Sequence, residues 1–226
     1  MLTVSEKKFS VIFSLIVIAE LFFESSERLI QFHYISKPAI VLSLLVFFWI
    51  KSKTLSKSLR YIIASALLFS LLGDLLLMFV EVSASYFLLG LVAFLIAHIM
   101  YVIAFLKHRN NAVKPFGFIA ILLVYACGLF YLLKEGLNEM LIPVIIYMIV
   151  ILSMSTAAFT RRDNVPKLSY ILVFLGAICF MISDSILALN KFFRPFEYAN
   201  FGIMLTYALA QYLIIIGILK LSKASR

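Results

Sequence analysis

The chain has 226 residues, of which 64% are hydrophobic and only 14% are charged, and its mean hydropathy is +1.10. A soluble globular domain carries about 45–50% apolar and about 25% charged residues, so this composition excludes a soluble domain and predicts an all-α, polytopic membrane protein. The net charge of +9 would suggest a nucleic-acid partner in a soluble protein. In a membrane protein the basic residues instead orient the helices and contact anionic headgroups, so we expect no nucleic-acid partner.

Charged and polar residues divide the chain into eight apolar segments, which we predict to be the helices of a transmembrane bundle. They lie at roughly residues 9–23, 37–50, 61–80, 85–106, 115–133, 139–160, 168–190 and 199–220. The first two are short for a full span, and we expect residues 20–30 to extend the first helix as a polar outer end. Pro38, Pro115 and Pro143 are expected near helix starts. The whole chain, residues 1–226, is expected to form one integral membrane domain.

The positions of the basic residues predict the orientation of the helices. Fifteen Lys and Arg fall in the amino-terminal tail, in residues 51–60, 107–114 and 161–167, and in the carboxyl-terminal tail, which ends at Arg226. The alternate set of loops holds only five. Because loops rich in Lys and Arg stay in the cytoplasm, we predict that both termini are cytoplasmic. The expected location is a bacterial plasma membrane.

A faint internal repeat relates the two halves of the chain. Residues of the first half recur in the second at offsets of 105, 109 and 110: Pro38, Tyr61 and Asp74 are matched by Pro143, Tyr170 and Asp184. The offset covers four helices, an even number, so both halves would have the same topology, related by an axis along the membrane normal. The pattern favours a 4+4 internal repeat, and chance similarity is the alternative.

Two aspartates lie within apolar helices, where a carboxylate costs several kcal/mol unless it is paired, hydrated or protonated. Asp74 occurs in SLLGDLLLMF and Asp184 in CFMISDSILAL, both in the outer half of predicted helices that run in the same direction. If these helices are neighbours, the two carboxyls share a proton and supply an acid and a base in one pocket. We therefore predict that Asp74 and Asp184 are catalytic. The alternative is that each aspartate only hydrogen-bonds a neighbouring helix.

Seven further polar side chains are candidates for binding a substrate near the two aspartates. They are Glu20, Lys37, His98, Tyr101, Asn200, Tyr207 and Gln211. Asn200, Tyr207 and Gln211 are spaced to share one face of the last helix.

Three of these candidates also have simpler explanations. Glu20 can reach interfacial water, Lys37 can extend to the lipid headgroups, and His98 can be a core histidine whose hydrogen bonds are satisfied. Only their convergence on one cavity would favour binding roles for all of them.

A zinc hydrolase is the main competing enzyme class, and the histidines argue against it. A catalytic zinc site needs about three N, O or S ligands. The chain has three histidines, of which His33 is expected in an outer loop and His108 in an inner loop, on opposite sides of the membrane. We therefore expect no metal and no other cofactor. Because no motif of a serine hydrolase or a phosphate-binding loop occurs, carboxylate acid/base chemistry is the best-supported enzyme class.

Five short motifs occur in order between the second and the eighth helix. They are Lys37-Pro38; Gly73-Asp74 followed by LLLM; Gly90 with FLIAHIMY; Ser183-Asp184-Ser185 with ILAL; and TYALAQYLI, which contains Tyr207 and Gln211. With these motifs the sequence resembles the lysoplasmalogenase family of YhhN-like membrane proteins. It departs from the family at TYALAQ, where a second aromatic residue beside Tyr207 is expected. The first helix carries no family motif, so a role for Glu20 rests on that residue alone.

The resemblance implies hydrolysis of the vinyl ether bond of a lysoplasmalogen, which releases a fatty aldehyde and glycerophosphoethanolamine or glycerophosphocholine. The expected partners are then a lysophospholipid substrate and membrane lipids. Vinyl ether cleavage needs a protonated acid and a nearby anion but no metal, which suits an aspartate pair, and Lys37 would hold the lipid phosphate. The alternatives are a proton-coupled transporter, because membrane carboxylates also serve proton relays, and a non-catalytic lipid-binding membrane protein.

Overall fold

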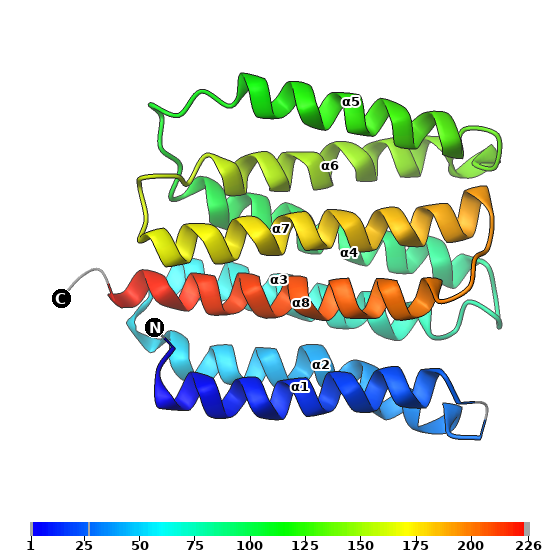
Figure 1. The fold of residues 1–226 in the computed structure, drawn as a ribbon, viewed down its shortest axis with the longest axis horizontal. Helices are drawn as coiled ribbons and strands as arrows, with labels where there is room; N and C mark the ends of the chain where they lie inside the picture. The colour runs from blue at the N-terminus through cyan, green and yellow to red at the C-terminus, as the bar shows by residue number, and fades with distance from the viewer. Residues whose placement is uncertain (1, 27, 224–226) are drawn as a thin grey trace. The chain divides into compact units, whose positions relative to one another are not determined.

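The computed structural model describes residues 2–26 and 28–223, and the regular structure of this part of the chain is entirely helical. Eight α-helices follow one another (Figure 1): α1 (Val4–Glu24), α2 (Ile30–Lys51), α3 (Lys57–Leu77), α4 (Ser85–Leu106), α5 (Phe116–Leu133), α6 (Leu141–Phe159), α7 (Lys167–Ala188) and α8 (Ala199–Leu219). Short helical turns extend or connect them: η1 (Ser52–Thr54), η2 (Asn138–Met140), the π-helical η3 (Leu189–Phe193) and η4 (Lys220–Lys223). The predicted all-α fold with eight helices is confirmed. Arg226, which we counted in the carboxyl-terminal tail, lies outside the described residues.

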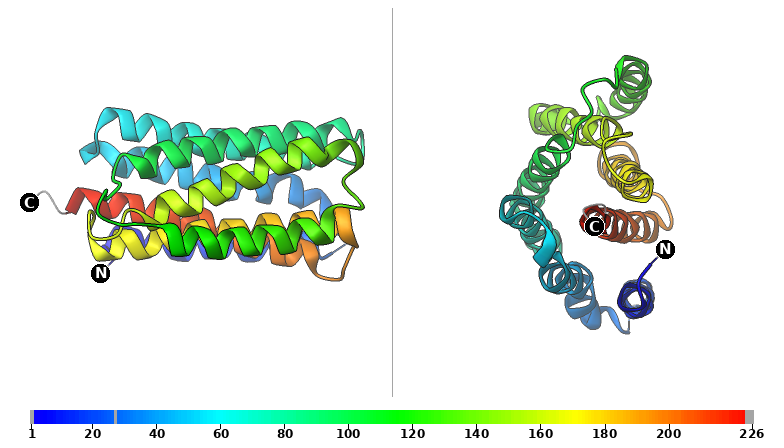
Figure 2. Two further views of the ribbon diagram at one scale, coloured as in Figure 1. Left: turned by 90° about the horizontal axis from the view of Figure 1, so that it is seen from above. Right: turned by 90° about the vertical axis from the view of Figure 1, so that its left-hand side faces the viewer.

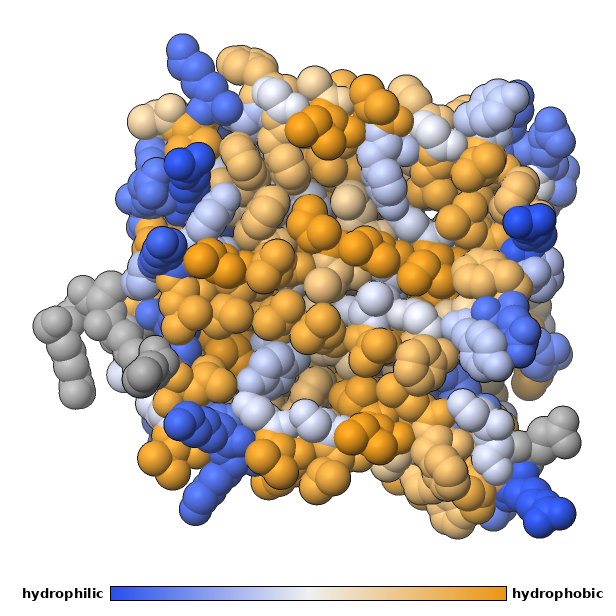
Figure 3. Space-filling view, in the orientation of Figure 1, coloured by the Kyte–Doolittle hydropathy of each residue, from blue (hydrophilic) through white to orange (hydrophobic). Residues whose placement is uncertain are grey.

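Seven of the described helices, α2 to α8, are long and apolar enough to cross a membrane. α1 also has 21 residues, but it contains Glu6, Lys7, Lys8, Glu20 and Glu24. Figure 3 shows hydrophobic side chains along the middle of the helices and hydrophilic side chains at their ends, as expected of helices that pass through a bilayer. The protein is an integral, multi-pass membrane protein. The cytoplasmic location of the termini and the internal repeat stay predictions.

α1 begins five residues earlier than predicted because its first turn is capped. The Thr3 hydroxyl accepts a hydrogen bond from the Glu6 backbone N–H at 3.2 Å, and the Glu6 carboxylate accepts one from the Thr3 N–H at 2.6 Å. This reciprocal capping box satisfies two backbone donors that a helix otherwise leaves free, so the helix can start among polar residues.

The predicted extension of α1 through residues 20–30 is wrong. α1 ends at Glu24, and the Ser25 hydroxyl donates to the Leu21 carbonyl at 2.7 Å, which satisfies one of the last backbone acceptors. The chain then turns, and its polar residues belong to a connection rather than to a longer helix.

α2 is longer at its start than predicted. It begins at Ile30, so His33 lies within this helix and the expectation of an outer loop is wrong. Pro38 lies inside α2 rather than near its start. The polar residues before Pro38 resemble a loop in the sequence, but His33 and Ser36 find a partner on α1, described below.

The described chain separates into two compact units, residues 1–100 and 101–226, and the boundary falls within α4. The single domain stays a prediction. In the first unit, α1 packs against α2 and α2 packs against α3; Figure 2 shows the α1–α2 pair from two further directions. α3 and α4 approach closely at Gly73, where an added Cβ would lie 2.6 Å from the Phe94 ring.

In the second unit, α7 packs along α8 and also against α6. The backbones of α7 and α8 nearly touch, because an added Cβ on Gly176 would lie 2.9 Å from the Ala210 carbonyl oxygen. Where α5 and α6 meet η3, a smaller apolar core forms around Leu133, Leu137 and Val144. This packing fixes α7, which carries one of the two predicted catalytic aspartates.

Candidate functional site

Asp184 lies on α7 and is held by a tyrosine of α6. Its side chain is half-buried, and the Tyr147 hydroxyl donates a hydrogen bond to Asp184 Oδ2 at 2.6 Å. Tyr147 itself is 8% exposed. A carboxyl on a membrane helix is therefore held by a hydrogen-bond donor of the neighbouring helix and is partly exposed.

The polar contacts continue from Tyr147 across α8 to α4. Tyr147 interacts electrostatically with Tyr207, and Gln211 Nε2 donates to the Tyr207 hydroxyl at 3.4 Å. The Tyr101 hydroxyl donates to Gln211 Oε1 at 2.6 Å. We call Asp184, Tyr147, Tyr207, Gln211 and Tyr101 the Asp184 cluster. Four of its five members were predicted as site residues, and the structure brings them together within the second unit.

Neighbouring serines hold Asp184 in place on α7. The Ser183 hydroxyl donates to the Ile203 carbonyl of α8 at 3.0 Å. Ser185 shares a hydrogen bond with the Tyr125 hydroxyl of α5. Contacts to α5, α6 and α8 therefore fix the rotation of α7 at this depth, and with it the direction of the Asp184 carboxyl.

Asn200, predicted to share a face with Tyr207 and Gln211, lies exposed in the first turn of α8. The structure does not bring it into the Asp184 cluster. Its role in binding a substrate stays a prediction.

Asp74 lies on α3 in the first unit and is 2% exposed. α3 and α4 approach closely beside it: besides the Gly73–Phe94 contact, an added Cβ on Gly90 would lie 3.5 Å from the Gly73 carbonyl oxygen. His98, a candidate of the same unit, is fully buried on α4. Because Asp74 and Asp184 belong to different units, their predicted pairing stays a prediction.

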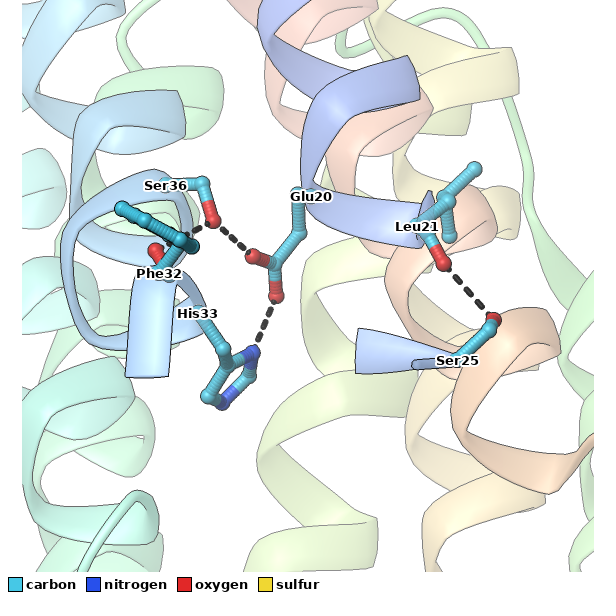
Figure 4. A network of polar contacts seen from close by, with 6 residues as sticks. All are labelled: Glu20, Leu21, Ser25, Phe32, His33 and Ser36. Carbon is cyan, nitrogen blue, oxygen red and sulfur yellow. Dashed lines mark hydrogen bonds and ion pairs between the residues drawn. The ribbon is translucent and has the colours of Figure 1, made fainter. Parts of the chain in front are cut away.

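Glu20 is the centre of a second polar group, at the end of α1 (Figure 4). Its side chain is 0% exposed. The Ser36 hydroxyl donates to Glu20 Oε2 at 2.5 Å, and His33 Nδ1 lies 2.7 Å from Glu20 Oε1. We call Glu20, His33 and Ser36 the Glu20 cluster. Both of its helices are members of the first unit, so it joins α1 to α2.

Lys37 follows Ser36 on α2 and is half-buried. It interacts electrostatically with Glu24 at the end of α1, and Glu24 also interacts with Glu20 and His33. Lys37 therefore lies near the Glu20 cluster, with Glu24 interacting with both.

The described residues contain no group of three or more His, Cys, Asp or Glu side chains that could hold a metal ion. His33 and His98 belong to the first unit and His108 to the second. The side chains of the two clusters are hydroxyls, carboxyls, an amide and an imidazole, which are suited to hydrogen bonding and proton transfer.

Sequence reasoning missed Tyr147, His33 and Ser36. Tyr147 occurs in the aliphatic stretch IPVIIYMIVIL, where a tyrosine adds to the apolar character and gives no sign of its partner. A signal was available: a phenol hydroxyl within a membrane helix needs a hydrogen-bond partner, so an isolated tyrosine at this depth indicates one.

Comparison with known proteins finds relatives that are named lysoplasmalogenase. The chain is 28% identical to lysoplasmalogenase TMEM86B of Homo sapiens over 86% of this chain and 78% of that protein. It is 32% identical to the lysoplasmalogenase of Mycobacterium bovis over 67% of this chain, and spans 58% of that protein. It is 31% identical to lysoplasmalogenase TMEM86A of Homo sapiens over 66% of this chain and 61% of that protein. No solved structure matches.

The chain matches the YhhN family over residues 32–218, a range that excludes Glu20 and contains both aspartates. With so much of its length matched, this integral membrane protein belongs to the YhhN family.

Proposed function

We propose that this protein is a lysoplasmalogenase, which hydrolyses the vinyl ether bond of an alkenyl lysophospholipid within the membrane. The observation that carries the proposal is the half-buried Asp184 carboxyl on a membrane helix, bonded to Tyr147 and connected to buried polar side chains. The names of the relatives support the same substrate class. A bacterial plasma membrane is the proposed location.

The reaction begins with proton transfer from an acid to the β-carbon of the vinyl ether, which leaves an oxocarbenium ion. Water adds to this cation and loses a proton to a base, and the resulting hemiacetal collapses to a fatty aldehyde and the glycerophospho-alcohol. One water is consumed, and the enzyme regains its proton. Slow proton transfer to carbon and a developing cation need a positioned acid and a nearby anion, as in glycoside hydrolysis.

We assign the roles of the acid and the nearby anion to Asp74 and Asp184. One carboxyl donates the proton, and the other stabilises the cation and orients water. Tyr147 fixes the Asp184 carboxyl by its hydrogen bond. Tyr101, Tyr207 and Gln211 form the hydrogen-bonded remainder of the Asp184 cluster, in surroundings that are otherwise apolar.

Lys37 is the proposed partner of the lipid phosphate, with Glu20, His98 and Asn200 as further substrate-binding candidates. Its ammonium is a flexible point charge suited to a phosphate. Lys37→Ala should raise KM more than it lowers kcat, because the contact is made equally in the ground and transition states.

The test is aldehyde release from a lysoplasmalogen by purified protein in detergent, with no gradient present. Asp184→Asn and Asp74→Asn keep the shape of the side chain but cannot transfer the proton, so each should lower kcat by about 10²–10⁴-fold. Asp163→Asn is the matched control, because Asp163 is 75% exposed in a loop, and it should keep full activity.

Full activity in either membrane-helix variant would remove that aspartate from the mechanism. If the purified wild type releases no aldehyde, the hydrolase proposal fails, and gradient-driven uptake in vesicles would then support a proton-coupled transporter.

A further inference from the structure

Arg161, at the start of the α6–α7 connection, is a fully buried cation with few partners. Its side chain is 0% exposed. Nη2 donates to the Ser169 hydroxyl at 3.1 Å, whereas Nε and Nη1 are buried and have no hydrogen-bond partner within the described chain. The guanidinium carbon lies 5.6 Å from the centre of the Phe105 ring. N–H donors on two of the three guanidinium nitrogens are therefore unsatisfied.

No acidic side chain of the described residues forms an ion pair with Arg161. Asp163, two residues later, pairs with Arg162 at 3.4 Å, and both of those side chains are largely exposed. Burial lowers the pKa of Arg161 to about 10, so the group stays charged at neutral pH. His108 faces it, and burial together with the charge of Arg161 lowers the pKa of His108 below its usual value, which keeps this imidazole neutral.

The α4–α5 and α6–α7 connections lie at the same end of their helices (Figure 1), and hydrogen bonds join them. Asn164 Nδ2 donates to the carbonyls of His108 and Arg109 at 3.0 and 3.2 Å. Asn110 Nδ2 donates to the Arg162 carbonyl at 3.0 Å, and the Asn110 N–H donates to the Thr160 carbonyl at 2.8 Å. Hydrogen bonds therefore hold the α4–α5 and α6–α7 connections together next to Arg161.

An isolated buried charge is costly, and each unsatisfied buried donor costs about 1–3 kcal/mol. A fold that keeps a buried guanidinium with unsatisfied donors is suited to binding an anion, which would accept hydrogen bonds from those N–H groups. Lys107, Arg109 and Lys114 in the neighbouring loop raise the local concentration of anions.

We propose that Arg161 and Ser169 form a binding site for a phosphate-class anion, supplied either by the headgroup of a membrane phospholipid or by free phosphate. The site is separate from the Asp184 cluster. Ser169 and Asp184 lie fifteen residues apart on α7, which is about 22 Å along a straight helix. An anion here would therefore act on stability or regulation and not on the bond that is cleaved.

The test measures thermal unfolding of the purified protein in detergent. The free-anion arm adds inorganic phosphate at constant ionic strength. The lipid arm adds a phosphatidic acid and compares it with the diacylglycerol of the same chains, which lacks only the phosphate. We expect the wild type and Arg162→Gln to gain thermal stability in at least one arm, and Arg161→Gln to gain none in either.

The arm that responds identifies the source of the anion. No response of the wild type in either arm, or a full response of Arg161→Gln, overturns the proposal. If Arg161→Gln does not fold, Arg161→Lys decides instead. Lysine keeps the charge but has fewer N–H donors, so the anion concentration that gives half of the gain in thermal stability should rise about tenfold. An unchanged dose dependence overturns the site.

Discussion

The hydrogen bond from Tyr147 to Asp184 joins α6 to α7 through two side chains that have different tasks in the proposed reaction. Asp184 takes part in proton transfer, and Tyr147 only orients it. Tyr147→Phe removes the hydroxyl and keeps the ring, so the carboxyl loses its fixed direction. We expect kcat to fall by about tenfold to a hundredfold, the range for a lost hydrogen bond to a charged group, with little change in KM.

Steady-state rates of aldehyde release decide this prediction, and Tyr170→Phe is the matched control. Tyr170 also lies in the second unit, and its ring stacks on Phe174, at 5.8 Å between ring centres. Tyr170→Phe keeps this stacked ring and removes only the hydroxyl, so kcat should stay unchanged. A Tyr147→Phe variant that loses thermal stability but keeps kcat would show a purely structural role.

Glu20 has both carboxylate oxygens occupied, one by Ser36 and one by His33. This favours stabilisation of the α1–α2 pair over direct contact with a substrate. Glu20→Gln keeps the size of the side chain but replaces one acceptor oxygen by a donor amide. We expect the free energy of unfolding to fall by about 1–3 kcal/mol, because a buried partner is left unsatisfied.

Thermal unfolding in detergent measures this loss. Glu81→Gln, at an exposed glutamate of the same unit, should cause no change. If Glu20→Gln instead raises KM while its thermal stability is normal, Glu20 contacts the substrate after all.

The α7–α8 pair depends on a glycine that lets two backbones approach. A Cβ on Gly176 would lie 2.9 Å from the Ala210 carbonyl oxygen and 3.0 Å from the Ile214 nitrogen. These are backbone atoms that cannot move aside without shifting α8. Gly176→Ala should therefore destabilise the protein by about 1–3 kcal/mol and lower kcat, because Tyr207 and Gln211 on α8 would shift as well.

Gly128→Ala on α5 is the control, since an added Cβ there meets no atom within 4 Å. This variant should be neutral or stabilising by up to about 1 kcal/mol, from the higher helix propensity of alanine. Unfolding temperatures and rates of aldehyde release, measured side by side, test both variants. Equal values for the two variants would mean that α7 and α8 can move apart without a loss of stability or activity.

Helix prediction succeeded where a helix is apolar throughout and was wrong where helices meet through polar side chains. The boundaries of α4 were predicted to the residue, because long aliphatic runs end at charged loops. The start of α2 was missed because His33 and Ser36 look like loop residues until Ser36 is seen to donate to Glu20 and His33 is seen to lie against it at ion-pair distance. Periodicity describes one helix at a time, and it carries no information about the partner of a polar side chain.

Because periodicity describes one helix at a time, it also limits which site residues could be predicted. Tyr207 and Gln211 were found by helical spacing, and the structure confirms their contact. Spacing also included Asn200, which is exposed in the first turn of α8. Pairing of Asp74 with Asp184 depends on helix packing over a long sequence separation, which no pattern within one helix encodes.

Whether α1 crosses the membrane decides the topology of the whole protein. Its 21 residues span about 31 Å, close to the hydrocarbon thickness of a bilayer. Its charges are either near an end, as for Lys7 and Lys8, or engaged, as for Glu20. We therefore expect α1 to be an eighth span, with both termini in the cytoplasm as the basic residues predict.

Single cysteines placed at the two ends of α1 test this topology in a background from which Cys127 and Cys179 have been removed. Because Lys7 and Ser25 are exposed, their substitutes are accessible to reagent. In intact cells, a membrane-impermeant maleimide should label Ser25→Cys but not Lys7→Cys, and permeabilised cells should label both. Arg162→Cys, at an exposed loop position predicted to be cytoplasmic, should behave like Lys7→Cys. Labelling of both α1 positions from the same side would mean that α1 lies on the membrane and that the protein has seven spans, with its termini on opposite sides.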